Sequence, residues 1–281
     1  MNSKIIIGSA NFGQVYGISK NRINLDNAKN ICNYAIKKKV KFIDTASSYK
    51  NSHKIISNLD KRLQVITKIL PCKKWKNFDY CLKKIQDIKI ELKNKDINTI
   101  LFHDEKFLLK KKSFKIYKNL EKLKKKGFFK NLGVSIYDFS NVKFLIKKYK
   151  IDVIQCPFNI FDQRLVSTNL LPWLRSKKIK VHVRSIFLQG LLLDSKYRKN
   201  SLFKRWENEL INLNNYINEN NLKIIDLCMS FVNSYNIDGY IVGIDSIKNL
   251  KEIMNFKKIK RIDFNIFAKK NKKLIDPRKW K

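Results

Sequence analysis

Short apolar runs alternate with longer amphipathic segments along the chain, and this alternation constrains the fold more than any other feature. Most of the runs are rich in Ile and Val and nearly apolar on both faces, as buried parallel strands are. They cover residues 4–10, 40–46, 63–69, 97–103, 131–137, 151–157, 180–186 and 239–245. The segments between them have helical spacing, for example at 28–39, 79–92 and 113–126. This alternation predicts a parallel sheet with crossover helices.

Eight strand–helix units in 281 residues fit a (β/α)8 TIM barrel. We expect a single domain over residues 1–281, with an extra helix near 202–218 after the seventh strand and a short C-terminal tail from about residue 262. A doubly wound open sheet is the alternative. Against it, the first strand is followed by "GSANFG", which lacks the spacing of a GxGxxG dinucleotide loop.

Ionisable residues stand at or just beyond the ends of three neighbouring strands. Asp44 ends the second strand, Lys68 the third and His103 the fourth, and Tyr49 follows Asp44 in "FIDTASSYKN". In a barrel these ends share the face that carries active sites. Each residue has a structural interpretation when taken alone, such as a helix cap for Asp44 or a core histidine for His103. Buried ionisable groups are costly unless paired, so the set together indicates a functional site.

The chemistry of this set is proton donation to a carbonyl oxygen. A phenol has a reference pKa of about 10. An ammonium beside the phenol, itself held by a carboxylate, lowers that pKa and lets the phenol give up its proton. An imidazole can orient the carbonyl oxygen. The set therefore predicts a site that protonates the alkoxide formed when a hydride reaches a carbonyl carbon.

Seven motifs in order resemble those of the aldo-keto reductase superfamily over nearly the whole chain. They are "DTASSY", "ITK", "LFH", "GVS", "QCPFNIFDQR", "RSIFLQGLLL" and "IVGIDSIKNLKE". The resemblance implies the (β/α)8 fold and the NAD(P)H-dependent reduction of a small-molecule aldehyde or ketone, without a metal. It also implies a catalytic tetrad of Asp44, Tyr49, Lys68 and His103. In that tetrad Tyr49 is the general acid, Lys68 pairs with Asp44 and tunes Tyr49, and His103 positions the substrate oxygen.

The same resemblance implies a cofactor site across the barrel mouth. Its residues are Ser135, Gln155, Arg184, Ser185, Leu188, Gly190, Gly243, Ser246 and Asn249. Arg184 stands where many members stack a tyrosine on the nicotinamide, and a planar guanidinium can also stack. Asp245 and Asn249 take the places of a lysine and an arginine that hold the 2′-phosphate of NADPH in many members. Family habit favours NADP(H), and the carboxylate of Asp245 keeps NAD(H) as the alternative.

Two stretches, "ANFGQVYGI" and "RSIFLQGLLL", resemble a bacterial subgroup associated with sugar or surface-polysaccharide biosynthesis. This resemblance implies an oxidised sugar or nucleotide-linked sugar as substrate. We expect Phe12, Asn159 and Phe187 to contribute to the substrate pocket, and the short tail to leave the mouth open. The alternative is a binding or partner module that holds the cofactor with little turnover, against which the intact tetrad argues.

The formal net charge of +38 has a compositional explanation. The basic residues are mostly Lys, Asn and Ile are abundant, and Ala and Gly are scarce, as A- and T-rich codons would produce. The lysines are spread along the chain on solvated helix faces, and no arginine stripe with interleaved aromatic residues appears. We therefore expect no specific nucleic-acid partner.

The cysteines and the apolar runs indicate where the chain resides. Five cysteines form no CxxC pair, which predicts reduced, buried thiols in a cytoplasmic protein. The first apolar run is too short for a signal peptide, and no run reaches the roughly 18 residues of a membrane span. We expect a monomer or a small homo-oligomer.

Overall fold

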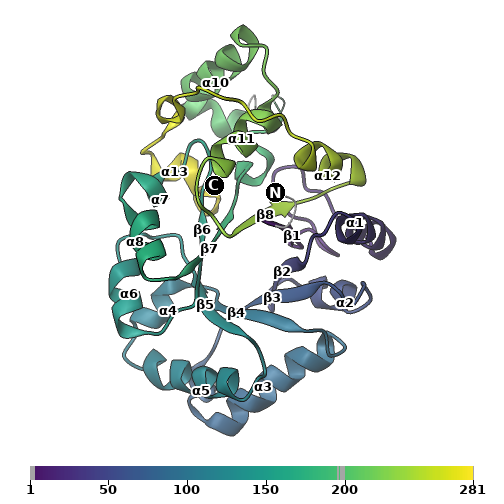
Figure 1. Ribbon diagram of the computed structural model, residues 1–281, viewed down its shortest axis with the longest axis vertical. Helices are drawn as coiled ribbons and strands as arrows, with labels where there is room; N and C mark the ends of the chain where they lie inside the picture. Colours follow the sequence, from purple (N-terminus) through teal and green to yellow (C-terminus); the bar gives the residue numbers. More distant parts are fainter. Residues whose placement is uncertain (1–3, 195, 197–199, 281) are drawn as a thin grey trace.

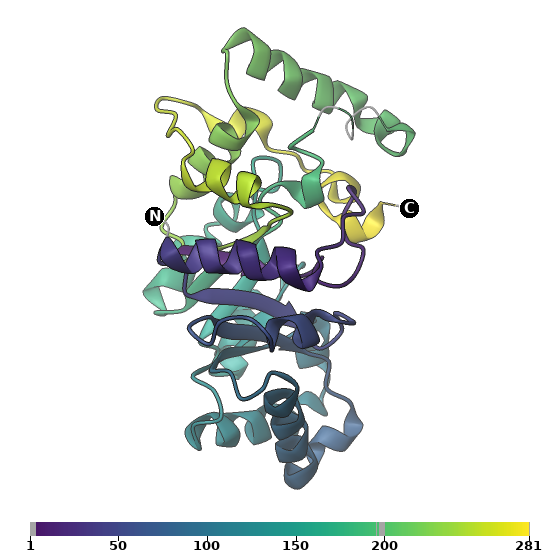
Figure 2. The same ribbon diagram turned by 90° about the vertical axis from the view of Figure 1, so that its right-hand side faces the viewer.

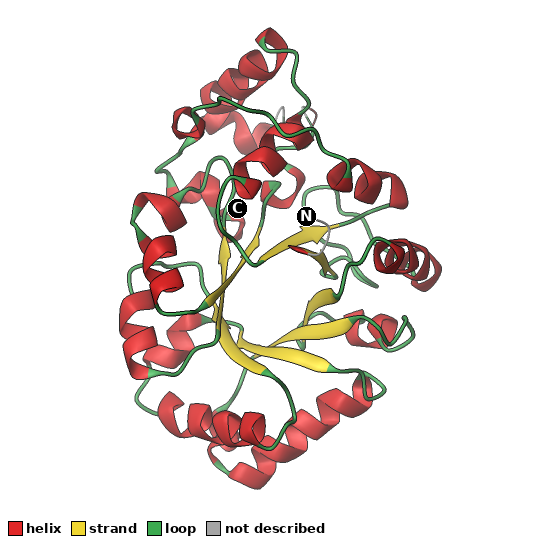
Figure 3. Ribbon diagram, viewed as in Figure 1, coloured by secondary structure: helices red, strands yellow, loops and turns green. Residues whose placement is uncertain are grey.

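The computed structural model describes residues 4–194, 196 and 200–280. Its eight parallel strands pair in chain order, and β8 pairs with β1 to close a barrel (Figure 3). The strands are β1 (Ile5–Gly8), β2 (Phe42–Ala46), β3 (Gln64–Ile69), β4 (Ile97–Phe102), β5 (Asn131–Ser135), β6 (Val153–Pro157), β7 (Lys180–Arg184) and β8 (Gly239–Gly243). Closure confirms the predicted (β/α)8 fold and rules out the open sheet.

Helices form a ring around the barrel (Figure 1). They are α1 (Leu25–Lys37), α2 (Ser52–Ile56), α3 (Phe78–Glu91), α4 (Glu105–Leu109), α5 (Ser113–Lys125), α6 (Val142–Lys148), α7 (Arg164–Ser167), α8 (Leu170–Ser176), α10 (Glu207–Glu219), α11 (Ile224–Asn233), α12 (Ile247–Met254) and α13 (Lys272–Ile275). Side-chain caps start several of them. Asn24 accepts a hydrogen bond from Asn27 N in α1, and Ser246 accepts one from Asn249 N in α12.

Apolar residues on both faces of the strands build two cores. Ile5 and Ile7 point outward into the large core between strands and helices, while Ile6 points inward. The inner cluster consists of Ile6, Ile66, Leu101, Val153 and Ile241. Because successive side chains of a strand alternate, nearly continuous apolar strands fill the barrel interior as well as its outer surface.

Close strand packing requires the glycine in "NLGVS". A Cβ atom at Gly133 would lie 2.1 Å from the carbonyl oxygen of Val153 and 2.7 Å from Leu101 Cδ2. The backbone of Val153 cannot move away, since it belongs to the neighbouring strand β6. Gly133 therefore lets β5 and β6 approach each other and the inner cluster.

The chain's C-terminus lies on the side toward which the strands point, opposite the N-terminus (Figure 2). The tail contains η5 (Phe264–Phe267), α13 and η6 (Pro277–Lys279). It is tied down by the bond from Lys269 N to Phe161 O, 2.8 Å, and by the edge-on contact of Trp280 with Phe203. These contacts hold the tail against the barrel, and no described tail residue lines the cavity described below, so the open mouth stays a prediction.

After β7 the chain forms the 3₁₀ helix η3 (Leu188–Gly190) and, further on, the 3₁₀ helix η4 (Ser201–Trp206), which leads into α10. The expected helix near 202–218 thus has a tight first turn, whose Phe203 and Trp206 are buried. The two helical pieces lie at one end of the molecule, beyond α11 (Figure 1).

Four of the five cysteines, Cys32, Cys81, Cys156 and Cys228, are buried. The expectation of burial is wrong for Cys72, which is exposed because it lies in the loop between β3 and η2 (Lys73–Lys76). In the described part of the chain, no helix has the length and apolarity needed to cross a membrane.

Candidate active site

A buried ion pair lies at the centre of the strand-end face. Lys68 Nζ lies 2.5 Å from Asp44 Oδ2, and the two side chains are only 3% and 5% exposed. The register between β2 and β3, which places Ala46 beside Lys68, brings them together from neighbouring strands. Gln155 Nε2 donates to the other carboxylate oxygen at 2.8 Å. The predicted Lys68–Asp44 pair is thus confirmed, and both oxygens of Asp44 are engaged.

Tyr49 and His103 lie beside this pair. The Tyr49 ring centroid is 5.5 Å from Lys68 Nζ and 6.2 Å from the His103 ring, which it meets edge-on. A tight turn positions the tyrosine, because Tyr49 N donates to Ala46 O at the end of β2. All four tetrad residues line one cavity of about 340 Å³. The structure therefore brings together the four residues that the motifs singled out.

Burial sets the protonation state of Tyr49. Desolvation raises the pKa of this phenol, the negative charge of Asp44 raises it further, and Arg184 opposes both. The expected lowering of the Tyr49 pKa is therefore wrong, because desolvation and the charge of Asp44 outweigh the cation that opposes them. Tyr49 therefore stays protonated at neutral pH, which is the state that a proton donor needs.

Burial also controls the imidazole and the ammonium. Desolvation and the charge of Lys68 lower the pKa of His103 to about 4, so the ring is neutral at pH 7. A neutral imidazole has one N–H donor and one acceptor nitrogen. Desolvation lowers the pKa of Lys68, and the ion pair with Asp44 opposes that shift.

The residues expected to hold the cofactor fall into two groups. Those that line the cavity are Ser135, Arg184, Ser185, Gly190 and Gly243. Those outside its lining are Gln155, Leu188, Ser246 and Asn249. Ser246 and Asn249 bind each other at the start of α12, through a 3.1 Å bond from Asn249 N to Ser246 Oγ.

Gln155 fits a carboxamide ligand. It is fully buried, its amide nitrogen binds Asp44, and its Oε1 atom has no hydrogen-bond partner among the described residues. A buried acceptor without a partner is costly. The N–H group of a nicotinamide carboxamide is a hydrogen-bond donor of the kind that Gln155 Oε1 needs.

The loop after β7 has an unusual backbone. Ser185, Leu188 and Gln189 have φ values of 58°, 47° and 53°, in the left-handed region that non-glycine residues rarely adopt. Gln189 Nε2 also donates to Tyr16 Oη, 3.1 Å away, in the loop after β1. Strained backbone of this kind concentrates at functional sites.

Only one of the three expected substrate residues lines the cavity. Phe187 does so, whereas Phe12 and Asn159 are fully buried outside its lining. The amide of Asn159 is used within the chain, because it donates to Ser185 O and accepts from Phe161 N. We therefore withdraw Phe12 and Asn159 from the substrate pocket. Phe12 packs in the large core instead, and Asn159 holds the loop after β7.

Sequence reasoning missed two pairings at the cavity mouth. Asn11 and Asn21 donate to the two carboxylate oxygens of Asp245, at 2.7 and 3.0 Å. The guanidinium groups of Arg184 and Arg278 both lie over the ring of Tyr137, with their central carbons 3.8 and 3.3 Å from its centroid. No local signal relates residues so distant in the chain.

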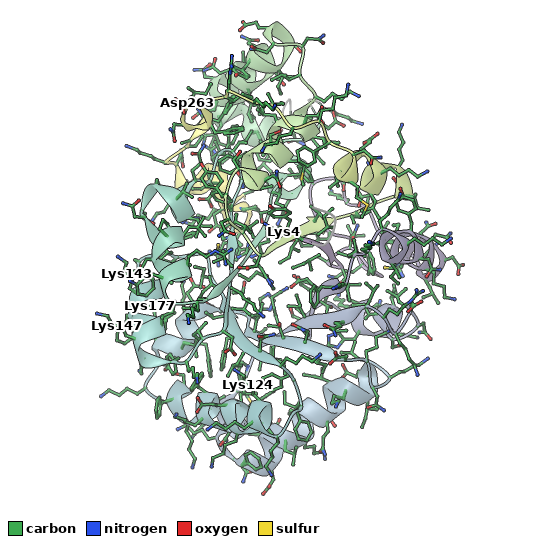
Figure 4. All side chains as sticks on the ribbon, viewed as in Figure 1. Lys4, Lys124, Lys143, Lys147, Lys177 and Asp263 are labelled. Carbon is green, nitrogen blue, oxygen red and sulfur yellow. The ribbon has the colours of Figure 1, made fainter. Side chains whose placement is uncertain are left out.

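Most of the excess lysines lie away from this site. Lys143, Lys147 and Lys177 point outward from the edge of the barrel (Figure 4). Within the described residues, no group of three or more His, Cys, Asp and Glu side chains is placed to hold a metal ion.

Comparison with known proteins identifies the chain's relatives. A model described as the aldo/keto reductase family matches residues 4–272. No curated protein matches the chain. Among solved structures, an aldo-keto reductase from Bacillus halodurans in its holo form superposes with a TM-score of 0.75 at 15% identity, covering 98% of this chain and 95% of that one.

Two further solved structures share the fold. An aldo/keto reductase from Klebsiella pneumoniae in complex with NADP and acetate has a TM-score of 0.69 at 15% identity, covering 94% of this chain and 88% of that one. A glycerol dehydrogenase from Gluconobacter oxydans has a TM-score of 0.67 at 16% identity, covering 94% and 89%. At these identities the superpositions show a common fold.

Proposed function

This chain belongs to the aldo/keto reductase family, and from that premise we propose that it reduces an aldehyde or ketone with NAD(P)H, using Tyr49 as the general acid. The observation that carries the proposal is the buried Lys68–Asp44 pair beside Tyr49 and His103 in one cavity. Such an arrangement supplies a proton donor, a cation and a neutral imidazole where a carbonyl oxygen would be reduced.

Each residue of the tetrad has its own role in the reduction. A bound NAD(P)H supplies the hydride. Neutral His103 donates its N–H to the carbonyl oxygen and orients it, since burial keeps the ring uncharged. Tyr49 gives its proton to that oxygen as negative charge develops there, which yields the alcohol. The cationic Lys68, held by Asp44, then stabilises the phenolate until it takes a proton from solvent.

The cofactor contacts follow from the same residues. We assign the carboxamide to Ser135 and Gln155, supported by the unpartnered Oε1 atom of Gln155. Arg184 would stack on the nicotinamide. Ser185, Leu188 and Gly190 would hold the pyrophosphate, and Gly243, Ser246 and Asn249 the adenosine end.

We propose NADP(H) as the cofactor, because it is the usual one in this family. NAD(H) is the alternative, because Asp245 places a carboxylate where the 2′-phosphate of NADPH would bind. The Klebsiella pneumoniae relative has NADP bound, which supports the first choice. Asn11 and Asn21 fix the carboxylate of Asp245 at the mouth, where it would repel an added phosphate.

For the substrate, we propose the carbonyl of a sugar or nucleotide-linked sugar, in sugar or surface-polysaccharide biosynthesis in the cytoplasm. The support is the sequence resemblance of two stretches, "ANFGQVYGI" and "RSIFLQGLLL". The active form would be a monomer or a small homo-oligomer. The second candidate, a partner module that holds the cofactor, is disfavoured because pure binding does not need the tetrad.

A titration followed by an activity assay tests the proposal. Fluorescence titration with NADPH and with NADH measures cofactor binding, and NAD(P)H oxidation with a panel of aldehydes measures turnover. Binding of at least one cofactor with aldehyde-dependent oxidation is expected. Binding without turnover on any aldehyde or sugar carbonyl would favour the partner module. Absence of binding to both cofactors would contradict the assigned cofactor site.

A further inference from the structure

Arg184 is a cation that faces the cavity. It ends β7, is half-buried and lines the same cavity as Tyr49 and His103. Among the described residues, no carboxylate lies within ion-pair distance of its guanidinium. The other cation of the cavity floor, Lys68, is neutralised by Asp44. A partly desolvated charge without a partner is costly, and a ligand that brings an anion would remove that cost.

Arg184 is held in one orientation before any ligand binds. Its Nη2 donates to Ile136 O at 2.9 Å, and its plane covers one face of Tyr137. Arg278 also lies over this ring, with its central carbon 3.3 Å from the centroid. Arg278 is itself fixed by a two-point contact with Asp276, at 2.9 and 2.8 Å. Such preorganisation lowers the entropic cost of binding.

The guanidinium keeps N–H groups free for a ligand. An arginine side chain has five N–H donors, and Ile136 O takes one of those of Arg184. The fork of donors matches the two oxygens of a carboxylate. Arg184 lines the same cavity as Tyr49 and His103, so these donors face the space in which the carbonyl would react.

We propose that Arg184 binds an anionic group of the substrate, so that this site prefers aldehydes or ketones that also carry a carboxylate. Tyr137 and Arg278 are positioning residues that hold Arg184 toward the cavity. The inference rests on the proposed carbonyl reduction and adds the substrate's charge to it. Arg184 can bind this anion and also stack on the nicotinamide, because the N–H edge of a guanidinium binds the anion and its flat face makes the stack. A cofactor phosphate offers the same anionic chemistry, and the experiment separates the two sources.

The experiment compares 4-carboxybenzaldehyde with its neutral methyl ester, methyl 4-formylbenzoate. We expect the wild-type kcat/KM to favour the carboxylate by about 10- to 100-fold, as a charge-assisted contact provides. In Arg184→Gln this ratio should fall to near 1. The ratio cancels any loss common to both substrates, including weaker cofactor binding. Arg205→Gln is the matched control, because Arg205 also stacks on an aromatic ring, Trp206, outside the cavity lining.

Arg278 tests the positioning role. In Arg278→Gln we expect a higher KM for the carboxylate substrate with little change in kcat, and Arg278→Lys should restore part of the preference. Thermal melts of each variant show whether it is folded. Equal ratios in wild type and Arg184→Gln would overturn the proposal. An unchanged ratio in Arg184→Gln together with a tenfold higher dissociation constant for NADPH or NADH would also overturn it. That result would assign Arg184 to a cofactor phosphate.

A binding measurement decides the question even without turnover. Absence of turnover on both aldehydes would count against the proposed reduction and not against the anion site. In that case, quenching of protein fluorescence by 4-(hydroxymethyl)benzoate and by its methyl ester is compared in wild type and Arg184→Gln. Tighter binding of the carboxylate that depends on Arg184 supports the site. Equal binding of the two ligands overturns it.

Discussion

Lys68 Nζ lies 2.5 Å from Asp44 Oδ2, in a pair whose side chains are almost fully buried. We expect Lys68→Met to lower the free energy of unfolding by about 3–5 kcal/mol, because it leaves a buried carboxylate without its counter-ion. The double variant with Asp44→Asn should recover part of this loss. Urea denaturation measures both effects.

The surface pair Lys84–Asp87 is the control for that experiment, since its side chains are 40% and 37% exposed. Lys84→Met should cost far less than Lys68→Met, because solvent screens an exposed ion pair. Equal losses for Lys68→Met and Lys84→Met would mean that the Asp44 pair is solvated in solution.

Tyr49→Phe should reduce kcat for aldehyde reduction by about 10²–10⁴-fold, the usual contribution of a general acid. The dissociation constant of the cofactor should change little, because the phenyl ring is retained. Steady-state kinetics and fluorescence titration give the two quantities. Tyr80→Phe, on α3 and outside the cavity lining, is the control that should leave both unchanged. An undiminished kcat in Tyr49→Phe would remove Tyr49 from the mechanism.

Asp245→Asn should shift cofactor preference toward NADPH. The change removes a negative charge at the cavity mouth while keeping an oxygen that can accept from Asn11 or Asn21. We expect the ratio of dissociation constants, NADPH to NADH, to fall by about 3- to 10-fold, as the removal of one partly solvated like charge predicts. Competitive fluorescence titration measures it, with Asp79→Asn on α3 as the control. An unchanged ratio would mean that the 2′ position of the cofactor's adenosine ribose lies away from Asp245.

The stability of the fold should decrease as the pH is lowered, because of one buried histidine. Desolvation lowers the pKa of His182 to about 4, below the ordinary value of 6.5. The unfolded chain therefore binds a proton that the folded chain does not bind between pH 6.5 and 4. The contribution of His182 to stability is therefore complete above pH 6.5, and it is lost as the pH falls from 6.5 to 4.

The expected loss from His182 between pH 7 and pH 5 is about 2 kcal/mol. His182→Gln should remove this part of the pH dependence, as measured by urea denaturation at the two pH values. His103, whose pKa is also lowered, would keep its own share. A slope that is identical in wild type and His182→Gln would mean that His182 titrates normally when folded.

The sequence by itself determined the barrel and the four residues at its centre. Strand and helix patterns are local, and eight repeats of one unit leave few closed topologies. Parallel strands also carry their ends to a common face, so that Asp44, Lys68 and His103 could be expected together before any contact was known. The position of Tyr49 followed from its distance along the chain from Asp44.

The tertiary structure alone decided the electrostatics and the walls of the site. Depth of burial, which no motif encodes, keeps Tyr49 protonated despite the nearby ammonium. The path of the tail brings Arg278 against Tyr137, and the packing of the loops removes Phe12 and Asn159 from the cavity. These features depend on contacts between segments far apart in the chain, and local sequence patterns carry no information about such contacts.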